Sequence, residues 1–275
     1  EHRLLNSSNF NVPQNRVRIY IVGILNQEFS LMTSSDVGAV DSHDFKDRLN
    51  ENFSPITVKD ILEGNPARRY QCSSKFTEQL KSVIGEDLSK LHGYRLIDTR
   101  GGSSIHSWEL GIKGKCTAAE VSFMNLLIAN RRKKKFGKHQ DGKALTREQI
   151  QTFFTGDGFD TVTKSLLKKG YLSKKDGRFN PVCGNMSFEV FKFLDPDSIS
   201  ITLTASDSNR LGIVQNGRAR RLTPRECARL QGFPDSYRLL EDDQAVYKQM
   251  GNAVSVPVIE ALVTDLIENN EQLIK

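Results

Sequence analysis

Two arginines near the start of the chain have the type and spacing to act on one bound group. Arg16 and Arg18 alternate at the head of residues 18–25, a short apolar run whose β-branched and aromatic composition predicts a strand buried on both faces. Alternate residues of a strand point to the same side, and a guanidinium offers several donors in a rigid plane. From this alternation alone, the pair would meet acidic side chains on the surface.

A glycine and an asparagine near the end of the chain form a second pair of candidate binding residues. Gly251 permits a close backbone approach, and Asn252 can both donate and accept hydrogen bonds. Alternatively, Asn252 caps the first turn of a terminal helix. We expect that helix over residues 257–274, with four apolar residues on its buried side: Val258, Ile259, Leu262 and Leu266.

A dense basic block suggests a polyanionic partner. It consists of Arg131, Arg132, Lys133, Lys134, Lys135 and Lys138, in a chain of net charge +6 and pI about 9.1. Such a block can contact phosphates, which gives affinity without sequence information. It can also be the solvated end of a helix, where the helix dipole favours cations. The two interpretations are compatible.

Cysteine and histidine positions argue against a metal site. The four cysteines, Cys72, Cys116, Cys183 and Cys227, form no CxxC pair, and no histidine has a partner four residues away. We therefore predict no metal and no disulfide, and a cytoplasmic location. No apolar run approaches the ~18 residues of a membrane span, so no membrane partner is expected. The chain does not begin with Met, from which a trimmed or partial chain is expected.

The middle of the chain predicts an α+β region. Thr117 and Glu120 form a capping box before a helix that the basic block closes. Residues 94–97 and 107–110 predict a hairpin-like pair of strands. Residues 144–181 read as helix, helix and basic hairpin, with a terminator at Gly170 and a tight turn at 176–177. That layout is typical of a winged-helix module, which can bind DNA or serve in packing alone.

Three segments carry a family resemblance. In chain order they are residues 9–18 (NFNVPQNRVR), 221–235 (RLTPRECARLQGFPD) and 249–258 (QMGNAVSVPV). Together they resemble the last three motif blocks of DNA (cytosine-5) methyltransferases. The resemblance implies a mixed α/β fold: the C-terminal remnant of a Rossmann-like catalytic domain with a large inserted α+β target-recognition domain. It also implies S-adenosylmethionine as cofactor and double-stranded DNA as partner, as in restriction–modification systems.

The same resemblance implies roles for single residues. In the family a thiolate attacks C6 of a flipped cytosine, and donors around the pocket hold the base and stabilise charge. By position those donors are Gln14, Arg16 and Arg18. The segment that closes over the cofactor corresponds to Gly251, Asn252, Ala253 and Val254.

Further residues are candidates for contact with DNA. Thr202 matches a family threonine that touches the DNA backbone near the flipped base. The other candidates are cations of expected loops, of the basic block and of the hairpin: Arg100, Arg210, Arg131, Arg132, Lys133, Lys174 and Lys175. Ordinary surface turns are the alternative for each loop.

The chain lacks the family's nucleophile motif. No cysteine follows a proline, as the family's Pro-Cys-Gln loop requires. Cys227 lies inside a motif, but Thr223 and Pro224 start a helix there, which makes it a small core residue. We expect the chain to be inactive alone, as a truncated enzyme completed in cis or as the recognition subunit of a split one. The rival interpretation is a non-catalytic winged-helix DNA-binding module.

The resemblance also predicts a partition of the chain. Residues 1–26 would belong to the catalytic domain, residues 27–248 to the target-recognition domain, and residues 249–275 to the cofactor side of the catalytic domain. Residues 221–235 would form a structural helix that orders the recognition domain.

Overall fold

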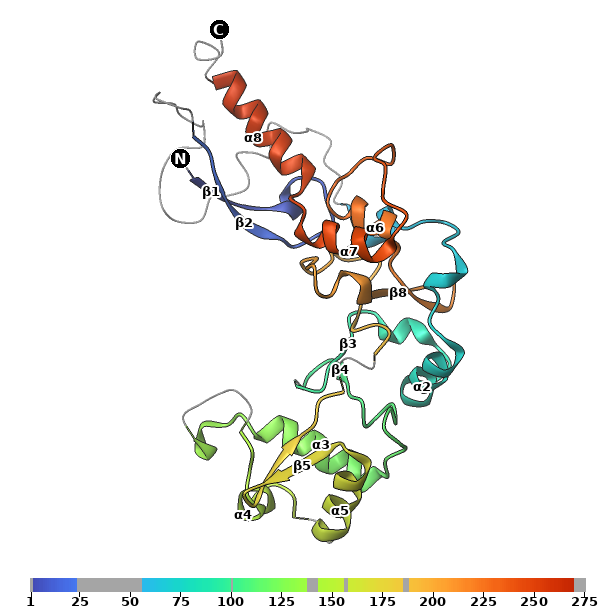
Figure 1. The fold of residues 1–275 in the computed structure, drawn as a ribbon, viewed down its shortest axis with the longest axis vertical. Coiled ribbons are helices and arrows are strands. Elements are labelled where there is room, and N and C mark those ends of the chain that lie inside the picture. The colour runs from blue at the N-terminus through green and yellow to red at the C-terminus, as the bar shows by residue number, and fades with distance from the viewer. Residues whose placement is uncertain are drawn as a thin grey trace. The chain divides into compact units, whose positions relative to one another are not determined.

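The computed structural model has a mixed α/β fold in two compact units (Figure 1). It describes residues 2–23, 56–99, 101–137, 143–155, 158–184 and 188–269. Unit 1 comprises Glu1–Tyr70, Leu194–Ile213 and Leu222–Lys275, and unit 2 comprises Gln71–Phe193 and Val214–Arg221. These compact units do not follow the expected partition by function, which stays a prediction.

Unit 1 contains a two-stranded antiparallel ribbon covered by a helix. Strand β1 (His2–Asn6) pairs with β2 (Val17–Ile21), and helix α8 (Val256–Asn269) packs on the face that carries Leu5 and Tyr20. The prediction of a strand buried on both faces is wrong. Among the described residues no third strand joins the ribbon, and α8 covers only one face, so Ile19 and Ile21 are exposed.

One helix of unit 1 begins where the sequence predicts it, and a second helix was not predicted. Helix α6 (Pro224–Arg229) starts with a capping box between Thr223 and Glu226 and with Pro224 in its first turn. Cys227 is fully buried in it, as expected. Helix α7 (Asp243–Asn252) is capped by the side chain of Asp242 and packs against α6. Four short 3₁₀ segments among the described residues also belong to this unit: η1 (Ser7–Asn9), η2 (Val58–Ile61), η3 (Arg68–Tyr70) and η7 (Ser208–Arg210).

The terminal helix forms over the whole part of its expected range that the structure describes, residues 257–269. Val258 and Leu262 are buried as predicted, Leu266 is half-buried, and Ile259 is exposed. Residues 270–274 of the expected helix lie outside the described residues. No single described helix is long and apolar enough to cross a membrane; α7 and α8 reach that length and composition only as a pair bent by 41°.

Unit 2 begins with α2 (Ser74–Ile84), η4 (Leu88–Leu91) and a sheet of short strands. The strand order is β4–β3–β7–β8–β9, for Ser104–Ile105, Arg95–Leu96, Lys192–Phe193, Leu211–Gln215 and Arg218–Arg221. All of these strands except the first part of β8 belong to unit 2. The predicted hairpin is wrong, because β3 pairs with β4 in parallel and residues 107–110 form a turn. The buried carboxylate of Asp98 accepts hydrogen bonds from Ser107 N and Oγ, which fixes that turn.

The rest of unit 2 has its own apolar core. It contains α3 (Ala118–Asn130), η5 (Lys134–Phe136), α4 (Arg147–Gln151), α5 (Phe159–Lys169), β5 (Leu172–Lys175) and β6 (Arg178–Pro181). Capping boxes start α3 and α4, and Gly170 ends α5 with a positive φ of 77°. Asp176 and Gly177 also have positive φ in the β5–β6 turn. These elements confirm the expected helices and hairpin; their interpretation as a winged helix stays a prediction.

Candidate functional site: a hydrogen-bonded scaffold of motif segments

Gln14 is the centre of the site in unit 1. Its side chain is fully buried. Nε2 donates to the Leu230 carbonyl at 2.8 Å, and Oε1 accepts from the Leu203 amide at 2.7 Å. Backbone hydrogen bonds from Asn15 N to Ser200 O and from Ser200 N to Pro13 O hold the same segments together. One amide side chain thus joins three segments that are far apart in the sequence.

Gln231 extends this buried network. Its Nε2 donates to the Met250 carbonyl at 2.7 Å, and its Oε1 accepts from Ser255 Oγ at 3.1 Å. Ser255 Oγ also lies 2.7 Å from Ser7 Oγ. The helix segment around α6 is therefore tied to the end of α7, to the start of α8 and to the end of β1.

Arg16 is part of the scaffold rather than of an open pocket. It is buried just before β2 begins, and Nη1 donates to Leu203 O at 2.6 Å. Its Nη2 donates to Ala253 O at 2.9 Å and, at 3.5 Å, to Gly251 O. Burial, and then the nearby charge of Arg18, lowers the pKa of Arg16. The donors of Arg16 thus satisfy backbone carbonyls of Leu203 and of the motif segment 249–258.

Arg18 lies in a different environment. It is an exposed residue of β2, and its Nη1 donates to the carbonyl of the adjacent Val17 at 2.7 Å. The strand starts at Val17, so Arg16 lies just before it and Arg18 within it, and the two side chains differ in burial. Of the three predicted pocket donors, Gln14 and Arg16 are buried in the scaffold and Arg18 is accessible.

Position 251 requires a glycine because the backbone of Thr204 and Ala205 lies close to its α-carbon. A Cβ on Gly251 would stand 2.4 Å from Ala205 N and from Thr204 C. Ala253 is half-buried, whereas Asn252 and Val254 are exposed. Asn252 is the last residue of α7, so it does not cap α8 as the alternative supposed.

The predicted DNA contacts of unit 1 occupy two positions. Thr202 is half-buried, and its Oγ1 donates to the Asn15 carbonyl at 2.7 Å. Arg210 is half-buried at the end of η7, and burial lowers its pKa. The scaffold thus brings Thr202 to the Gln14 segment. Arg100, a further candidate, lies outside the described residues.

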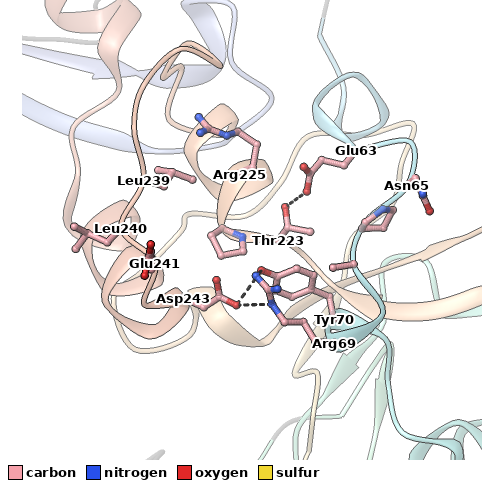
Figure 2. Close-up of a pocket in the computed structure, with 13 residues that line it drawn as sticks. Glu63, Asn65, Arg69, Tyr70, Thr223, Arg225, Leu239, Leu240, Glu241 and Asp243 are labelled. Carbon is pink, nitrogen blue, oxygen red and sulfur yellow. Dashed lines mark hydrogen bonds and ion pairs between the residues drawn. The ribbon is translucent and has the colours of Figure 1, made fainter.

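Unit 1 also contains a pocket that no sequence motif indicated (Figure 2). It has a volume of about 430 Å³ and lies between residues 63–70 and 223–243. Asp243 accepts hydrogen bonds from Arg69 Nε at 3.2 Å and from Tyr70 Oη at 2.9 Å, and Thr223 Oγ1 donates to Glu63. These pairs connect η3 to the start of α7, and residue 63 to the start of α6. The charges in the pocket serve this connection, so it offers no evident catalytic group.

Comparison with known proteins identifies the family. The family described as C-5 cytosine-specific DNA methylase matches residues 1–268. The chain belongs to this family. The match therefore extends through the segments between the three motif blocks and is not confined to them.

Named members of the methylase family are close relatives. The type II methyltransferase M.BanI of Aneurinibacillus aneurinilyticus is 62% identical over 269 residues, which cover 97% of this chain and 63% of that protein. M.HgiCI of Herpetosiphon aurantiacus is 57% identical, over 97% of this chain and 64% of that protein. The chain thus spans just under two thirds of the length of these relatives. A solved structure, the Dnmt2 methyltransferase of S. pombe, is 15% identical, with a TM-score of 0.46 over 97% of this chain and 57% of that chain.

None of the thiols of this methylase chain is activated. Burial, followed by the charge of Glu189, raises the pKa of Cys72 to about 12, and burial followed by the charge of Glu120 raises that of Cys116 to about 11. Burial also raises the pKa of Cys183 and of Cys227. A nucleophilic cysteine needs a lowered pKa. Among the described residues, no group of three or more His, Cys, Asp or Glu is placed to hold a metal.

The basic block of this methylase chain divides into a buried residue and exposed ones. Arg131, the C-cap of α3, is buried, and its Nη2 donates to Asn180 Oδ1 at 2.8 Å. Arg132 and Lys133–Lys135 are exposed beyond the helix end, whereas Lys138 lies outside the described residues. Lys174 and Lys175 are exposed on β5, with Lys174 Nζ 5.1 Å from the centre of the Phe179 ring. Of the candidate cations of unit 2 that the structure describes, Arg131 is therefore buried and the others are exposed.

Proposed function

We propose that this chain is the C-terminal, DNA-recognising part of a DNA cytosine-5 methyltransferase that transfers a methyl group from S-adenosylmethionine. Membership of the family supports the reaction. The hydrogen bonds around Gln14 support the separate roles of buried positioning residues and exposed contact residues. These hydrogen bonds hold the motif segments in one arrangement, and Arg18, Asn252 and Val254 are exposed beside them. This arrangement is the single observation that carries the proposal.

The nucleophile is proposed to come from outside this chain. Cytosine C5 is a poor nucleophile until a thiolate adds to C6, and the thiols here are held protonated by burial. Arg18 would then hold the flipped base and stabilise the charge that develops on it. Gln14 and Arg16 would act as positioning residues, because their donors already satisfy the protein backbone.

S-adenosylmethionine would supply the methyl group. Asn252 and Val254 are the residues of the expected cofactor segment whose side chains are accessible, so they would contact it. Gly251 would not contact it, since its α-carbon faces the backbone of Thr204 and Ala205. In the expected cofactor segment, Asn252 and Val254 would thus contact the cofactor, and Gly251 would allow the segment to pack against Thr204 and Ala205.

Duplex DNA would be recognised mainly through unit 2. Its exposed cations Arg132, Lys133, Lys174 and Lys175 would contact phosphates, and the winged-helix-like segment 144–181 would present the last two. Buried Arg131 would position Asn180 instead. In unit 1, Thr202 and Arg210 remain candidate contacts beside the base.

The proposal is tested by complementation. Alone, the 275-residue chain should transfer no methyl group to DNA. Activity should appear when the part of M.BanI that has no counterpart here is supplied, fused in cis or co-expressed in trans. Tritiated methyl incorporation into DNA, with enzyme purified from a host without cytosine methylases, measures it. Transfer by the chain alone would contradict the proposal.

A further inference from the structure

His106, directly after β4 in unit 2, has a ring that the fold holds in one orientation. Its Nδ1 lies 2.7 Å from the carbonyl oxygen of Ile97, and the ring stacks on Trp108 at a centroid distance of 4.5 Å and an angle of 18°. Because a carbonyl oxygen only accepts, Nδ1 carries the proton and donates it to this hydrogen bond. In the neutral ring, Nε2 is therefore a hydrogen-bond acceptor.

The stack between His106 and Trp108 is itself fixed by a closed set of hydrogen bonds. The fully buried Trp108 donates from Nε1 to Asn125 Oδ1 at 2.7 Å, and Asn125 Nδ2 donates to Glu109 Oε1 at 3.1 Å. The second oxygen of Glu109 accepts from the backbone amide of His106 at 2.7 Å. These contacts lead from the backbone of His106 back to its ring, so the ring cannot turn without breaking one of them.

The fold makes no use of the second ring nitrogen of His106. Only 5% of the residue is exposed, yet no hydrogen bond joins Nε2 to any residue that the structure describes. Nor is Nε2 among the described side-chain atoms that are shut off from solvent without a partner, so it reaches the surface of unit 2. Polar atoms of a core residue are normally paired. A histidine with a purely structural role would have a partner for Nε2 as well.

His106 is connected to the segment that holds the basic block. The next residue, Ser107, packs closely on Gly184, where an added Cβ would stand 3.0 Å from Ser107 Cβ. Four residues before Gly184, Asn180 accepts a hydrogen bond from Arg131 at 2.8 Å. The exposed cations of the basic block follow Arg131 directly. The available nitrogen and the proposed phosphate contacts thus belong to one connected part of unit 2.

We propose that His106 is a specificity-determining residue, which reads one base pair of the target through Nε2. This inference rests on the proposed function, in which unit 2 recognises duplex DNA. In the major groove an acceptor can bind the exocyclic amino group of cytosine or adenine, whereas guanine and thymine present acceptors there. A fixed acceptor therefore distinguishes amino bases from keto bases. Because the ring is already held, little conformational entropy is lost when it binds.

The test compares two substitutions with opposite consequences, in the enzyme completed with the unmatched part of M.BanI. His106→Asn keeps an amide donor for the Ile97 carbonyl at the place of Nδ1, but it has no atom at the place of Nε2. His106→Gln can place an amide oxygen there and loses the Nδ1 donor. We expect His106→Asn to lower discrimination at one base pair by about tenfold, and His106→Gln to keep most of it. Bisulfite sequencing of a methylated pool of random duplexes measures this discrimination.

A control variant and a change in the DNA make the result independent of folding defects. His92→Asn, at a half-buried histidine of unit 2, should leave the sequence profile unchanged. For the parental enzyme, duplexes that lack one amino group carry purine for adenine or 2-pyrimidinone for cytosine. At one position outside the target cytosine, this loss should slow methylation by about tenfold. His106→Asn should abolish that difference, because the acceptor is already missing.

Several outcomes would overturn the inference. One is an unchanged profile with His106→Asn, and another is a loss of discrimination with His106→Gln alone, which would assign the residue to the Ile97 contact. An equal loss of affinity for all sequences would make His106 a phosphate contact. If the completed enzyme transfers no methyl group, the proposed function fails. Selection of bound duplexes by the chain alone then still tests His106, since His106→Asn should relax the selected sequence at one position.

Discussion

Arg16 and Arg18 are two residues apart and have opposite environments. Arg16 donates hydrogen bonds to the carbonyls of Leu203 and Ala253, whereas Arg18 is an exposed residue of β2. The motif match pointed to both as pocket donors. The long-range contacts of Arg16 with Leu203 and Ala253 distinguish it as a structural residue from the accessible Arg18, and these contacts cannot be read from the local sequence.

Arg18→Ala in the complete enzyme tests the role of the accessible arginine. We expect the single-turnover methylation rate to fall by about 10²–10³-fold, the usual effect of removing one charge-stabilising donor. Arg18→Lys should not restore the rate, because a lysine lacks the planar set of donors. DNA affinity should change much less than the rate. The control is Arg238→Ala, at another exposed arginine of unit 1; near-parental rates for both Arg18 variants would refute the assignment.

Gly251→Ala tests the close approach at the end of α7. The added Cβ would stand 2.4 Å from backbone atoms of Thr204 and Ala205, which cannot move without shifting the Leu203 segment. We expect a loss of about 1–3 kcal/mol or more in the free energy of unfolding, measured by urea denaturation. Gly64→Ala is the control, since Gly64 has open space around its α-carbon. Equal stability of the two variants would contradict this account.

At the scale of elements, helix starts follow from sequence and strand pairings do not. The capping boxes at Thr117, Thr146 and Thr223 each join residues three apart, so local sequence contains all of the information. The pairing of β3 with β4 depends on Asp98, which binds Ser107 across a turn, and on strands contributed from far along the chain. Two-residue strands carry too little periodicity to predict this.

The capping box of α3 also contains a buried ion pair. Lys169 Nζ lies 2.6 Å from Glu120 Oε2, and the Thr117 amide donates to the same carboxylate. Burial raises the pKa of Glu120, but hydrogen bonds from Lys169, Ser165 and the Thr117 backbone outweigh it and bring the pKa to about 2. A folded-state pKa below the unfolded value of about 4.3 stabilises the fold above that pH, and the contribution disappears as the pH falls toward 2.

Glu120→Gln should therefore destabilise the chain in a pH-dependent way. We expect a loss of roughly 3 kcal/mol near neutral pH, because Lys169 would be left without its buried partner. The difference from the parental chain should shrink between pH 4.3 and about 2. Denaturant titrations across this range measure it. Glu78→Gln, at an exposed position of α2, should have little effect at any pH; a pH-independent loss for Glu120→Gln would exclude the ion pair as its cause.

At the scale of the whole molecule, charge predicts a salt-dependent interaction with duplex DNA. Each phosphate contact releases counterions and contributes about −0.9 to the slope of log K against log salt. Neutralising Arg132, Lys133, Lys134 and Lys135 should make the slope less steep by about 2–4. The matched control neutralises four other exposed lysines of unit 2, which are Lys75, Lys90, Lys164 and Lys168. Fluorescence anisotropy at several salt concentrations measures the slope. An unchanged slope would show that the basic block is only a solvated helix end.

The path of the chain limits how relatives of this family can be recombined. The backbone leaves unit 1 after Tyr70, returns at Leu194, leaves again after Ile213 and returns at Leu222. A hybrid that exchanges residues 71–193 alone would keep the parental β8 and β9, whereas one that also carries residues 214–221 keeps only the first part of β8 parental in that sheet. An exchange of unit 2 between two such enzymes must therefore carry 214–221 together with 71–193. Residues 214–221 have to come from the same parent enzyme as residues 71–193.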